Sequence, residues 1–182
     1  MRGYFGVGVE GISKEQNVGT IVRSAHSFGA SFFFTINPDV NVHALKTSDT
    51  SDAFDHLPYY QYAAPQELDL PLSCTLIGVE FVEEAIELPS FRHPLRAAYI
   101  LGPEMGHLSP EIVSQCNHVI KIPMKFCVNV GVAAAIIMYD RMVCLGRFAE
   151  RPVKAGGPLL EDMKPKQSTI RRKIRNKKQT ES

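Results

Sequence analysis

One stretch, residues 119–139, constrains the fold more than any other part of the chain. It begins with a short, mainly apolar run at 119–122, which predicts a strand that ends at Pro123, because proline has no N–H to donate to a sheet. A bend follows at 125–129. Ten residues, 130–139, are then almost entirely apolar and do not alternate, which predicts a buried helix. A strand, a bend and a helix therefore follow one another directly.

The predicted helix has a thin surface. Gly131 and the three alanines at 133–135 let another backbone approach closely. This surface either presses against a ligand or a second subunit, or packs as an ordinary core helix. The residues of the helix leave both interpretations open.

The remaining apolar runs alternate between strands and helices. Strands are predicted at 4–9, 32–36, 57–62, 74–80 and 97–101, and helices at 17–28, which Gly29 ends, and 110–116, which Ser109 caps. Ser13 or Asn17 is expected to cap the first helix. Because the strands are apolar on both faces, the pattern predicts an α/β fold with a largely parallel sheet. Ligands bind such sheets at the carboxyl ends of the strands, where the bends 102–107 and 124–129 follow.

Length and cysteine usage limit the class of protein. The chain has 182 residues and no apolar run of the roughly 18 residues that a membrane span needs. Its N-terminus does not resemble a signal peptide. The four cysteines are far apart and form no C-x-x-C pair. We therefore expect a cytoplasmic protein with reduced thiols, no metal site and no membrane partner.

Charge is distributed unevenly along the chain. Residues 1–150 hold 10 Lys and Arg against 16 Asp and Glu, a net charge of −6, whereas residues 151–182 hold 10 against 3, a net charge of +7. The second segment is also poor in apolar residues. The sequence therefore predicts a domain at 1–150 and a disordered basic tail at 151–182. Such a tail either neutralises the phosphates of a nucleic acid or only keeps the protein soluble.

Three local patterns do not predict a functional site. Residues 6–11 match G-x-G-x-x-G, but only five residues precede them and a polar turn follows, so we reject a dinucleotide site. The polar loop 46–52 is favoured as a solvated loop over a phosphate site, because its two aspartates repel an anion. An acidic run is expected to form a solvated face; its members are Glu80, Glu83, Glu84 and Glu87.

Three motifs in order resemble a known family. They are Asn17-x-Gly19-x-x-x-Arg23, then Leu101-Gly102-Pro103-Glu104-Met105-Gly106, and finally Ile122-Pro123-Met124 followed by Asn129-Val130-x-Val132-Ala133. Together they resemble the SPOUT superfamily, specifically its TrmH-like RNA ribose 2′-O-methyltransferases, over about residues 4–148. The resemblance implies a carboxyl-terminal trefoil knot, S-adenosyl-L-methionine as methyl donor, a homodimer, and tRNA or rRNA as substrate.

The resemblance also implies roles for single residues. Asn17 and Arg23 are expected to face the RNA. Glu104 is expected to hold its own loop or contact RNA, and Asn129 to organise the active site; these four residues are the predicted catalytic set. Because a guanidinium group has a pKa above about 12, Arg23 is expected to bind a phosphate and stabilise a developing alkoxide, not to act as a base.

Further residues are implied to bind the cofactor and the RNA. The predicted cofactor site consists of Leu101, Gly102, Gly106, Ile122, Met124, Cys127, Val128 and Val130. The predicted RNA-binding residues, besides Arg23, are Lys46, Lys164, Lys166, Arg171, Arg172, Lys173, Arg175, Lys177 and Lys178. Cys127 stands where the family usually has a serine, and the bend around it is shorter than in many relatives. This departure leaves a second hypothesis, a catalytically weak relative that binds RNA.

Overall fold

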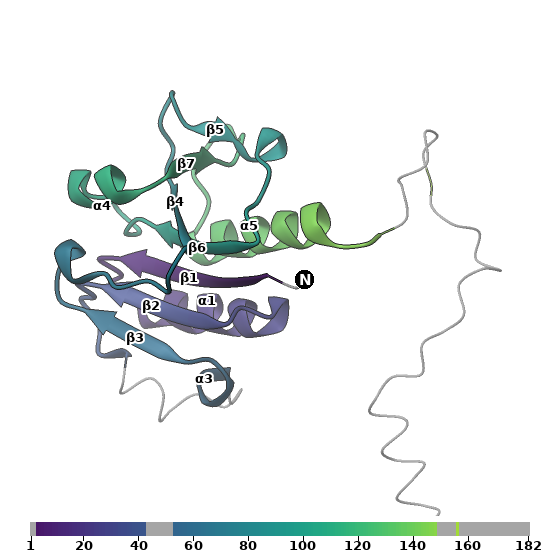
Figure 1. Cartoon of the computed structure of the whole chain (residues 1–182). Helices are drawn as coiled ribbons and strands as arrows, with labels where there is room; N and C mark the ends of the chain where they lie inside the picture. The colour runs from purple at the N-terminus through teal and green to yellow at the C-terminus, as the bar shows by residue number, and fades with distance from the viewer. Residues whose placement is uncertain (1–2, 43–52, 149–155, 157–182) are drawn as a thin grey trace, which may run out of the picture. The chain divides into compact units, whose positions relative to one another are not determined.

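Parallel strands form one seven-stranded sheet in this protein, whose computed structural model describes residues 3–42, 53–148 and 156 (Figure 1). The order along the sheet is β3-β2-β1-β6-β4-β7-β5, and each pair of neighbours is parallel. The strands are β1 (Tyr4–Glu10), β2 (Phe32–Ile36), β3 (Tyr59–Tyr62), β4 (Thr75–Val79), β5 (Ile86–Glu87), β6 (Arg96–Leu101) and β7 (His118–Lys121). The predicted α/β class and parallel sheet are confirmed; the two-residue strand β5 was not predicted.

Four α-helices accompany these strands within the described residues; three lie between strands and the fourth follows the last strand. They are α1 (Glu15–Phe28), α3 (Ala53–His56), α4 (Pro110–Gln115) and α5 (Val130–Leu145), with two short 3-10 turns, η1 (Pro65–Glu67) and η2 (Leu88–Ser90). The predicted helix ends are confirmed at two places. Gly29 ends α1 with a φ of 77°, and the Ser109 hydroxyl accepts a hydrogen bond from the N–H of Ile112 at the start of α4. The predicted capping of α1 by Ser13 or Asn17 is wrong: the N-cap residue is Lys14, and no side chain makes a capping hydrogen bond at this end of the helix.

The strand order differs from the chain order in a way that assembles one edge of the sheet. Strand β6 lies between β1 and β4, and β7 pairs with the other side of β4. Because all these pairs are parallel, the carboxyl ends of β1, β6, β4 and β7 lie in a row. The segments that follow these strands therefore meet at one place.

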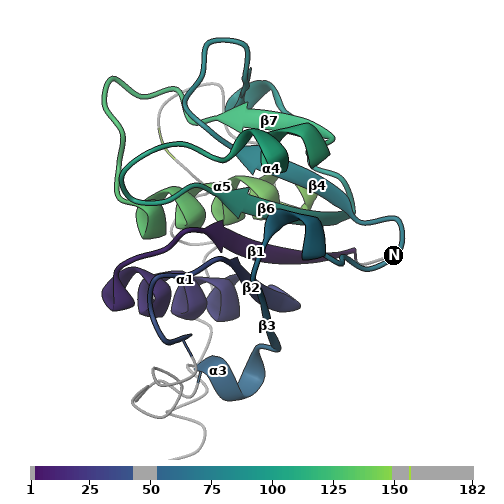
Figure 2. The same ribbon diagram turned by 90° about the vertical axis from the view of Figure 1, so that its left-hand side faces the viewer.

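Alternating side chains of the strands divide the core into two layers. Val7, Phe33 and Tyr99 belong to the layer beneath α1 and α5, which pack against each other (Figure 2). The opposite layer contains Phe32, Phe34, Ile100 and Ile112 and is covered by α4.

Two glycines of the rejected dinucleotide motif have a packing role. A Cβ atom on Gly6 would lie 2.2 Å from the Phe32 ring, and one on Gly8 would lie 2.2 Å from the Phe34 ring. Only a residue without a side chain leaves room for the two rings on this face of the sheet. These glycines thus follow from the packing of β1 against β2.

The thin surface of α5 serves two neighbours. A Cβ atom on Gly131 would lie 2.8 Å from the Thr20 methyl group, so the absence of a side chain lets α1 and α5 approach closely. Ala134 is fully buried in the core. Ala133, one residue earlier, lines a cavity instead. One side of the helix therefore packs in the core, as one interpretation predicted, and another side lines a cavity, where contact with a ligand stays a prediction.

A buried arginine ties the second half of α5 to the sheet. Arg141 donates hydrogen bonds to the backbone carbonyls of Pro94, at 2.5 Å, and Leu95, at 2.9 Å, and to the Tyr99 hydroxyl at 3.2 Å. Its guanidinium group also lies over the Phe5 ring, 5.0 Å from the ring centre. Because a buried charge is costly unless it is fully hydrogen-bonded, these partners are what makes Arg141 tolerable in the core.

A buried histidine extends this cluster. His93 Nδ1 lies 2.5 Å from the Tyr99 hydroxyl, and its Nε2 lies 2.9 Å from the Asp140 carboxylate. Burial lowers the pKa of His93, although the hydrogen bond with Asp140 opposes this effect. Burial likewise raises the pKa of Tyr99 to about 12, against the opposing charge of Arg141. Both groups are therefore neutral near pH 7.

The chain divides into two units, Met1–Arg147 and Phe148–Ser182. Of the second unit, only Phe148 and Gly156 are among the described residues. The predicted basic tail and the polar loop 46–52 lie outside the described residues and stay predictions. In the part of the chain that is described, no helix combines the length and the apolar character that crossing a membrane requires.

Candidate functional site

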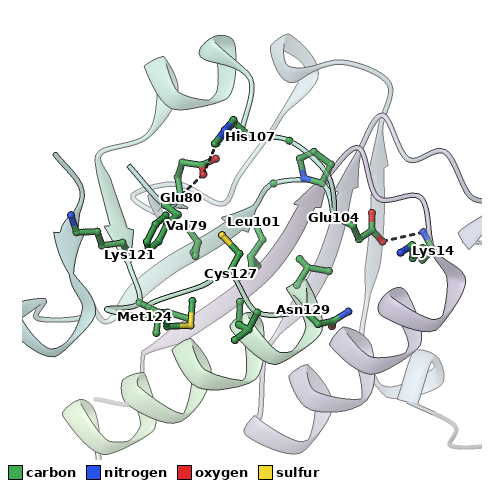
Figure 3. Close-up of a pocket in the computed structure, with 18 residues that line it drawn as sticks. Lys14, Val79, Glu80, Leu101, Glu104, His107, Lys121, Met124, Cys127 and Asn129 are labelled. Carbon is green, nitrogen blue, oxygen red and sulfur yellow. Dashed lines mark hydrogen bonds and ion pairs between the residues drawn. The ribbon is translucent and has the colours of Figure 1, made fainter. Parts of the chain in front are cut away.

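A cavity of about 560 Å³ opens at the carboxyl ends of β4, β6 and β7, beside the start of α5 (Figure 3). It lies where parallel sheets usually bind ligands. All eight residues of the predicted cofactor site line it: Leu101, Gly102, Gly106, Ile122, Met124, Cys127, Val128 and Val130. The bends 102–107 and 124–129, which are separate in the chain, thus form two walls of one cavity.

The lining combines apolar walls with charged groups. Val79, Leu101, Ile122 and Ala133 contribute apolar surface from the strand ends and α5. The side chains with carboxylate, ammonium or imidazole groups are Lys14, Glu80, Glu104, His107 and Lys121. Figure 3 shows Glu104, Lys14 and Asn129 on one side of the cavity, and Glu80 with His107 on the other. The chemistry of the cavity therefore differs from one end to the other.

Glu104 is the most extensively hydrogen-bonded group of the site. Its Oε2 accepts from the backbone N–H and the hydroxyl of Ser13, at 3.1 and 3.0 Å. Its Oε1 accepts from the backbone N–H of Lys14 at 3.1 Å and from Asn17 Nδ2 at 2.7 Å. Glu104 thus holds the segment directly before α1 in place, through the backbone N–H groups of Ser13 and the N-cap residue Lys14.

The ionisation of Glu104 follows from these contacts. Partial burial alone would raise the pKa of the carboxyl group. The hydrogen bonds from Asn17 and Ser13 outweigh burial, and the net effect is a pKa below the ordinary value. Glu104 is therefore a carboxylate at neutral pH, suited to holding its neighbours in place and unsuited to donating a proton.

Two asparagines continue this network to α5. Asn129 Nδ2 donates to Asn17 Oδ1 at 2.9 Å, and Asn129 Oδ1 accepts from the backbone N–H of Gly131 at 2.9 Å. The orientation of both amides is fixed by their outer partners. Glu104 can only accept, so the end of the Asn17 amide that faces it is the nitrogen, and the Gly131 N–H can only donate, so the end of the Asn129 amide that faces it is the oxygen. The chain Glu104–Asn17–Asn129 therefore joins the three sequence motifs through side chains, in one arrangement.

Asn17 was expected to face the RNA, but its side chain is buried. It is 6 % exposed, and both ends of its amide are used by Glu104 and Asn129. In the single chain the Asn17 amide therefore contacts protein groups at both ends, and its expected contact with RNA stays a prediction. A buried amide needs hydrogen-bond partners within the protein, and at this position Asn17 finds one for its N–H group and one for its oxygen.

Arg23 lies apart from the cavity. It is exposed on α1, six residues and thus under two turns beyond Asn17, and it is not one of the described residues that line the cavity. Its carbonyl accepts from the Ser27 hydroxyl at 2.8 Å. Within one chain, the structure does not bring Arg23 together with the other three predicted catalytic residues. The predicted RNA-binding residues Lys46 and 164–178 lie outside the described residues.

Eight lining residues were not among the predicted site residues, and four of them carry charged or imidazole side chains. Lys14, Glu80, His107 and Lys121 all reach the cavity. The expectation of a solvated face is wrong for Glu80, whose side chain is 10 % exposed, although Glu83, Glu84 and Glu87 are exposed. A signal was present: Glu80 directly follows a predicted buried strand, at the end where parallel sheets bind ligands.

Comparisons with known proteins agree with this geometry. The profile of the SpoU rRNA Methylase family matches residues 5–139. No curated protein matches the sequence. Among solved structures, the SpoU methyltransferase AviRb from Streptomyces viridochromogenes, in complex with the cofactor AdoMet, is 21% identical with a TM-score of 0.68; the match covers 79% of this chain and 61% of that one.

Two further structures have the same fold. An AdoMet-bound rRNA methyltransferase from Sinorhizobium meliloti is 15% identical with a TM-score of 0.67, over 81% of this chain and 59% of that one. A protein described for 2-OH methylation of C/U34 on tRNA is 21% identical with a TM-score of 0.67, over 79% of this chain and 91% of that one. This chain thus spans about 60% of the length of the first two proteins.

Proposed function

The chain belongs to the SpoU rRNA Methylase family, and from this premise we propose that it methylates a ribose 2′-hydroxyl group of tRNA or rRNA with S-adenosyl-L-methionine as donor. The observation that carries the proposal is the hydrogen-bonded chain Glu104–Asn17–Asn129 at one end of the cavity. It joins the three motifs beside a space of suitable size and chemistry for the cofactor.

The residues of the cavity fit S-adenosylmethionine. A volume of about 560 Å³ lies in the range of small-molecule sites, roughly 300–1,000 Å³. The apolar walls at Val79, Leu101 and Ile122 suit an adenine ring, and carboxylates suit a molecule with a cationic sulfur. When bound, the cofactor would supply a methyl group on that sulfur: the ribose oxygen would form a bond to the methyl carbon as the carbon–sulfur bond breaks, S-adenosylhomocysteine would leave, and the hydroxyl proton would pass to solvent.

The protein contributes position and electrostatics to this reaction. Glu104 and Asn17 hold the amide of Asn129, and through it the first turn of α5, in a fixed place. Side chains that are already oriented need no rearrangement when charge develops at the site. We assign to Arg23 the binding of an RNA phosphate and the stabilisation of a developing alkoxide.

The position of Arg23 favours a homodimer in which it serves the cavity of the partner chain. Arg23 is exposed and outside the cavity of its own chain. Helix α5, which packs against α1, carries exposed apolar side chains at Val132, Tyr139 and Met142. Contact between two copies through this surface would bury these side chains and move Arg23 toward a second cavity.

The basic tail is the proposed RNA-binding element of the chain. Residues 1–150 are net negative, whereas residues 151–182 are net positive by seven charges. A polyanion is attracted to the second segment and repelled by the first. The proposal also includes the trefoil knot that the resemblance implies and a cytoplasmic location.

Methylation by the purified protein tests this function. The protein should transfer a labelled methyl group from S-adenosylmethionine to total tRNA or rRNA, and the product should resist alkaline cleavage at one ribose, because a 2′-O-methyl group blocks attack on the adjacent phosphate. Label on a base, or no binding of S-adenosylmethionine, would contradict the proposal. Mapping ribose methylation in cells with and without the gene would identify the nucleotide.

The alternative is an RNA-binding relative with weak catalysis, and Cys127 is the observation that favours it. This residue is an exposed thiol that lines the cavity, where the family usually has a serine. A thiol is a weaker hydrogen-bond partner than a hydroxyl. Cys127→Ser separates the two hypotheses: a large gain in methyl transfer would support weak catalysis in the wild type, and an unchanged rate would support a competent enzyme.

A further inference from the structure

The two carboxylates of the cavity differ in the acceptor capacity that remains to them. An ionised carboxylate has about four acceptor positions. Glu104 receives four hydrogen bonds, two on each oxygen, from Ser13, Lys14 and Asn17. Its capacity is therefore used within the protein. Glu80, on the opposite side of the cavity, retains capacity for a ligand.

Main-chain groups hold Glu80 in place. Its Oε2 accepts from the N–H of Leu108 at 2.7 Å, and its Oε1 accepts from the N–H of Phe81 at 2.8 Å. The side chain is 10 % exposed and lines the cavity. One acceptor position on each oxygen is thus fixed by the backbone, which sets the orientation of the carboxylate before any ligand binds.

The third partner of Glu80 is easily displaced. His107 Nδ1 lies 3.0 Å from Oε1, but the His107 side chain is 73 % exposed. Such a side chain can turn into water at little cost, because an exposed contact of this kind contributes little stability. Once it turns, each oxygen of Glu80 has one acceptor position free.

Two hydroxyl groups on neighbouring carbons match this arrangement. A vicinal diol can donate one hydrogen bond to each oxygen of a carboxylate, and an acidic side chain after a parallel strand recognises ribose hydroxyl groups in this manner in dinucleotide-binding folds. We propose that Glu80 binds the ribose diol of the nucleoside part of the cofactor, an inference that rests on the proposed function. Glu80 thereby selects a ribonucleoside at this end of the cavity.

The surroundings of Glu80 favour the nucleoside over the amino-acid part of the cofactor. The apolar side chains of Val79 and Leu101 lie at the ends of β4 and β6, beside Glu80, and suit an adenine ring. The proposed methyl transfer takes place at the other end, near Glu104 and Asn129. A Cβ atom at Gly102 would lie 3.1 Å from the backbone nitrogen of Leu108 and 3.7 Å from Glu80 Oε2, so Gly102, which also lines the cavity, lies directly beside the carboxylate.

Calorimetric titration tests the proposal with stable ligands. The ligands are S-adenosylhomocysteine, its 2′-deoxy and 3′-deoxy analogues, and 5′-methylthioadenosine, which keeps the diol but lacks the amino acid. Wild-type protein should bind each deoxy analogue about 10- to 100-fold more weakly, the usual effect of losing a hydrogen bond to a charged group. This measurement needs no variant, so it does not depend on how a substitution folds.

The variant Glu80→Gln should bind S-adenosylhomocysteine and 5′-methylthioadenosine more weakly by a similar factor, and should distinguish ribose from deoxyribose less than wild type, because the amide keeps only one oxygen acceptor. Glu84→Gln, an exposed member of the same acidic run outside the cavity, is the matched control and should behave as wild type. If Glu80→Gln weakened the ribose and deoxyribose forms equally, Glu80 would only support the 102–108 loop, and the proposal would be overturned. Unchanged binding of 5′-methylthioadenosine would overturn it as well.

The same titrations separate this inference from the proposed function. A wild-type protein that binds S-adenosylhomocysteine without any preference for ribose leaves methyl transfer standing and overturns only the role of Glu80. A wild-type protein that binds neither S-adenosylmethionine nor S-adenosylhomocysteine overturns both.

Discussion

Asn129 and Asn17 are 112 residues apart in the chain, yet Asn129 Nδ2 donates a hydrogen bond of 2.9 Å to Asn17 Oδ1. This bond joins the first turn of α5 to the first turn of α1. Glu104 extends the connection to the loop after β6, because it accepts from the other end of the Asn17 amide. A change at Asn17, the middle member, should therefore affect all three segments of the site.

We expect Asn17→Asp to lower the free energy of unfolding by about 1–3 kcal/mol at neutral pH. It replaces a donor 2.7 Å from Glu104 with a second carboxylate. Two adjacent carboxylates raise the pKa of one of them, so the loss should shrink as acid protonates the pair. In the wild type, Glu104 has a lowered pKa in the folded state, so its carboxylate stabilises the protein at neutral pH, and this stabilisation is lost as acid protonates it. Urea unfolding across a pH series measures this, with the exposed neighbour Gln16→Glu as control; equal midpoints at pH 7 would contradict it.

His93 should make the protein sensitive to acid. Burial lowers the pKa of His93 in the folded protein, whereas the unfolded chain has the ordinary value of about 6.5. The unfolded state therefore takes up a proton first, and the stabilising effect, complete above about pH 6.5, is lost as pH falls below it. His93→Gln should flatten the dependence of the unfolding midpoint on pH in this range. The exposed His26→Gln should keep the wild-type slope, and parallel profiles for wild type and His93→Gln would refute the assignment.

Arg23→Ala should abolish methyl transfer and leave the affinity for S-adenosylmethionine nearly unchanged. Arg23 lies outside the cavity and therefore does not touch the cofactor within its own chain. Loss of a group that stabilises charge in the transition state costs about 10²–10³ in rate. Single-turnover rates and calorimetric affinities measure the two effects separately. Arg92→Ala, at another exposed arginine, serves as control, and a variant that keeps most of its activity would remove Arg23 from the mechanism.

We expect the protein to sediment as a dimer at micromolar concentration. Tyr139→Asp, which places a charge on the exposed apolar surface of α5, should produce a folded monomer, because Tyr139 is 51% exposed in the single chain. A wild-type monomer would contradict the dimer.

Mixed dimers test whether the two chains share a site. Arg23→Ala mixed with Gly102→Val should recover part of the activity if Arg23 serves the cavity of the partner. A Cβ atom at Gly102 would lie 3.1 Å from the backbone nitrogen of Leu108, so the valine variant should lose its cofactor site. No recovery in a confirmed mixed dimer would show that each chain uses its own Arg23.

Deletion of the chain from Lys164 onward should weaken RNA binding without changing S-adenosylmethionine binding. The deleted segment contains the cationic run at 171–178, with six Lys and Arg. If all six contact phosphates, the slope of log affinity against log salt should fall by about 4 to 5, at 0.7–0.9 per phosphate. Filter binding at several salt concentrations measures the slope. Equal affinities and slopes for both proteins would reduce the tail to a solubilising segment.

Local sequence patterns predicted most of the helices and strands of this protein. The ends of α1 and α4 depend on Gly29 and Ser109, which act within one or two turns, so they were predictable from neighbouring residues. The two bends that line the cavity were also predictable, because parallel strands place their carboxyl ends at one edge. The edge strand β5, only two residues long, has no such local pattern.

Tertiary structure alone decided how the site is connected. Asn17 was expected to face RNA, but a buried amide needs partners, and those partners, Glu104 and Asn129, come from segments 87 and 112 residues away. Glu80 was predicted to belong to a solvated acidic run, but it lines the cavity, because the strand order β6-β4-β7 places the end of β4 there. Contacts at such separations depend on strand order, which no local pattern of side chains encodes, because hydrophobic periodicity specifies the face that a strand buries and not the strand beside it.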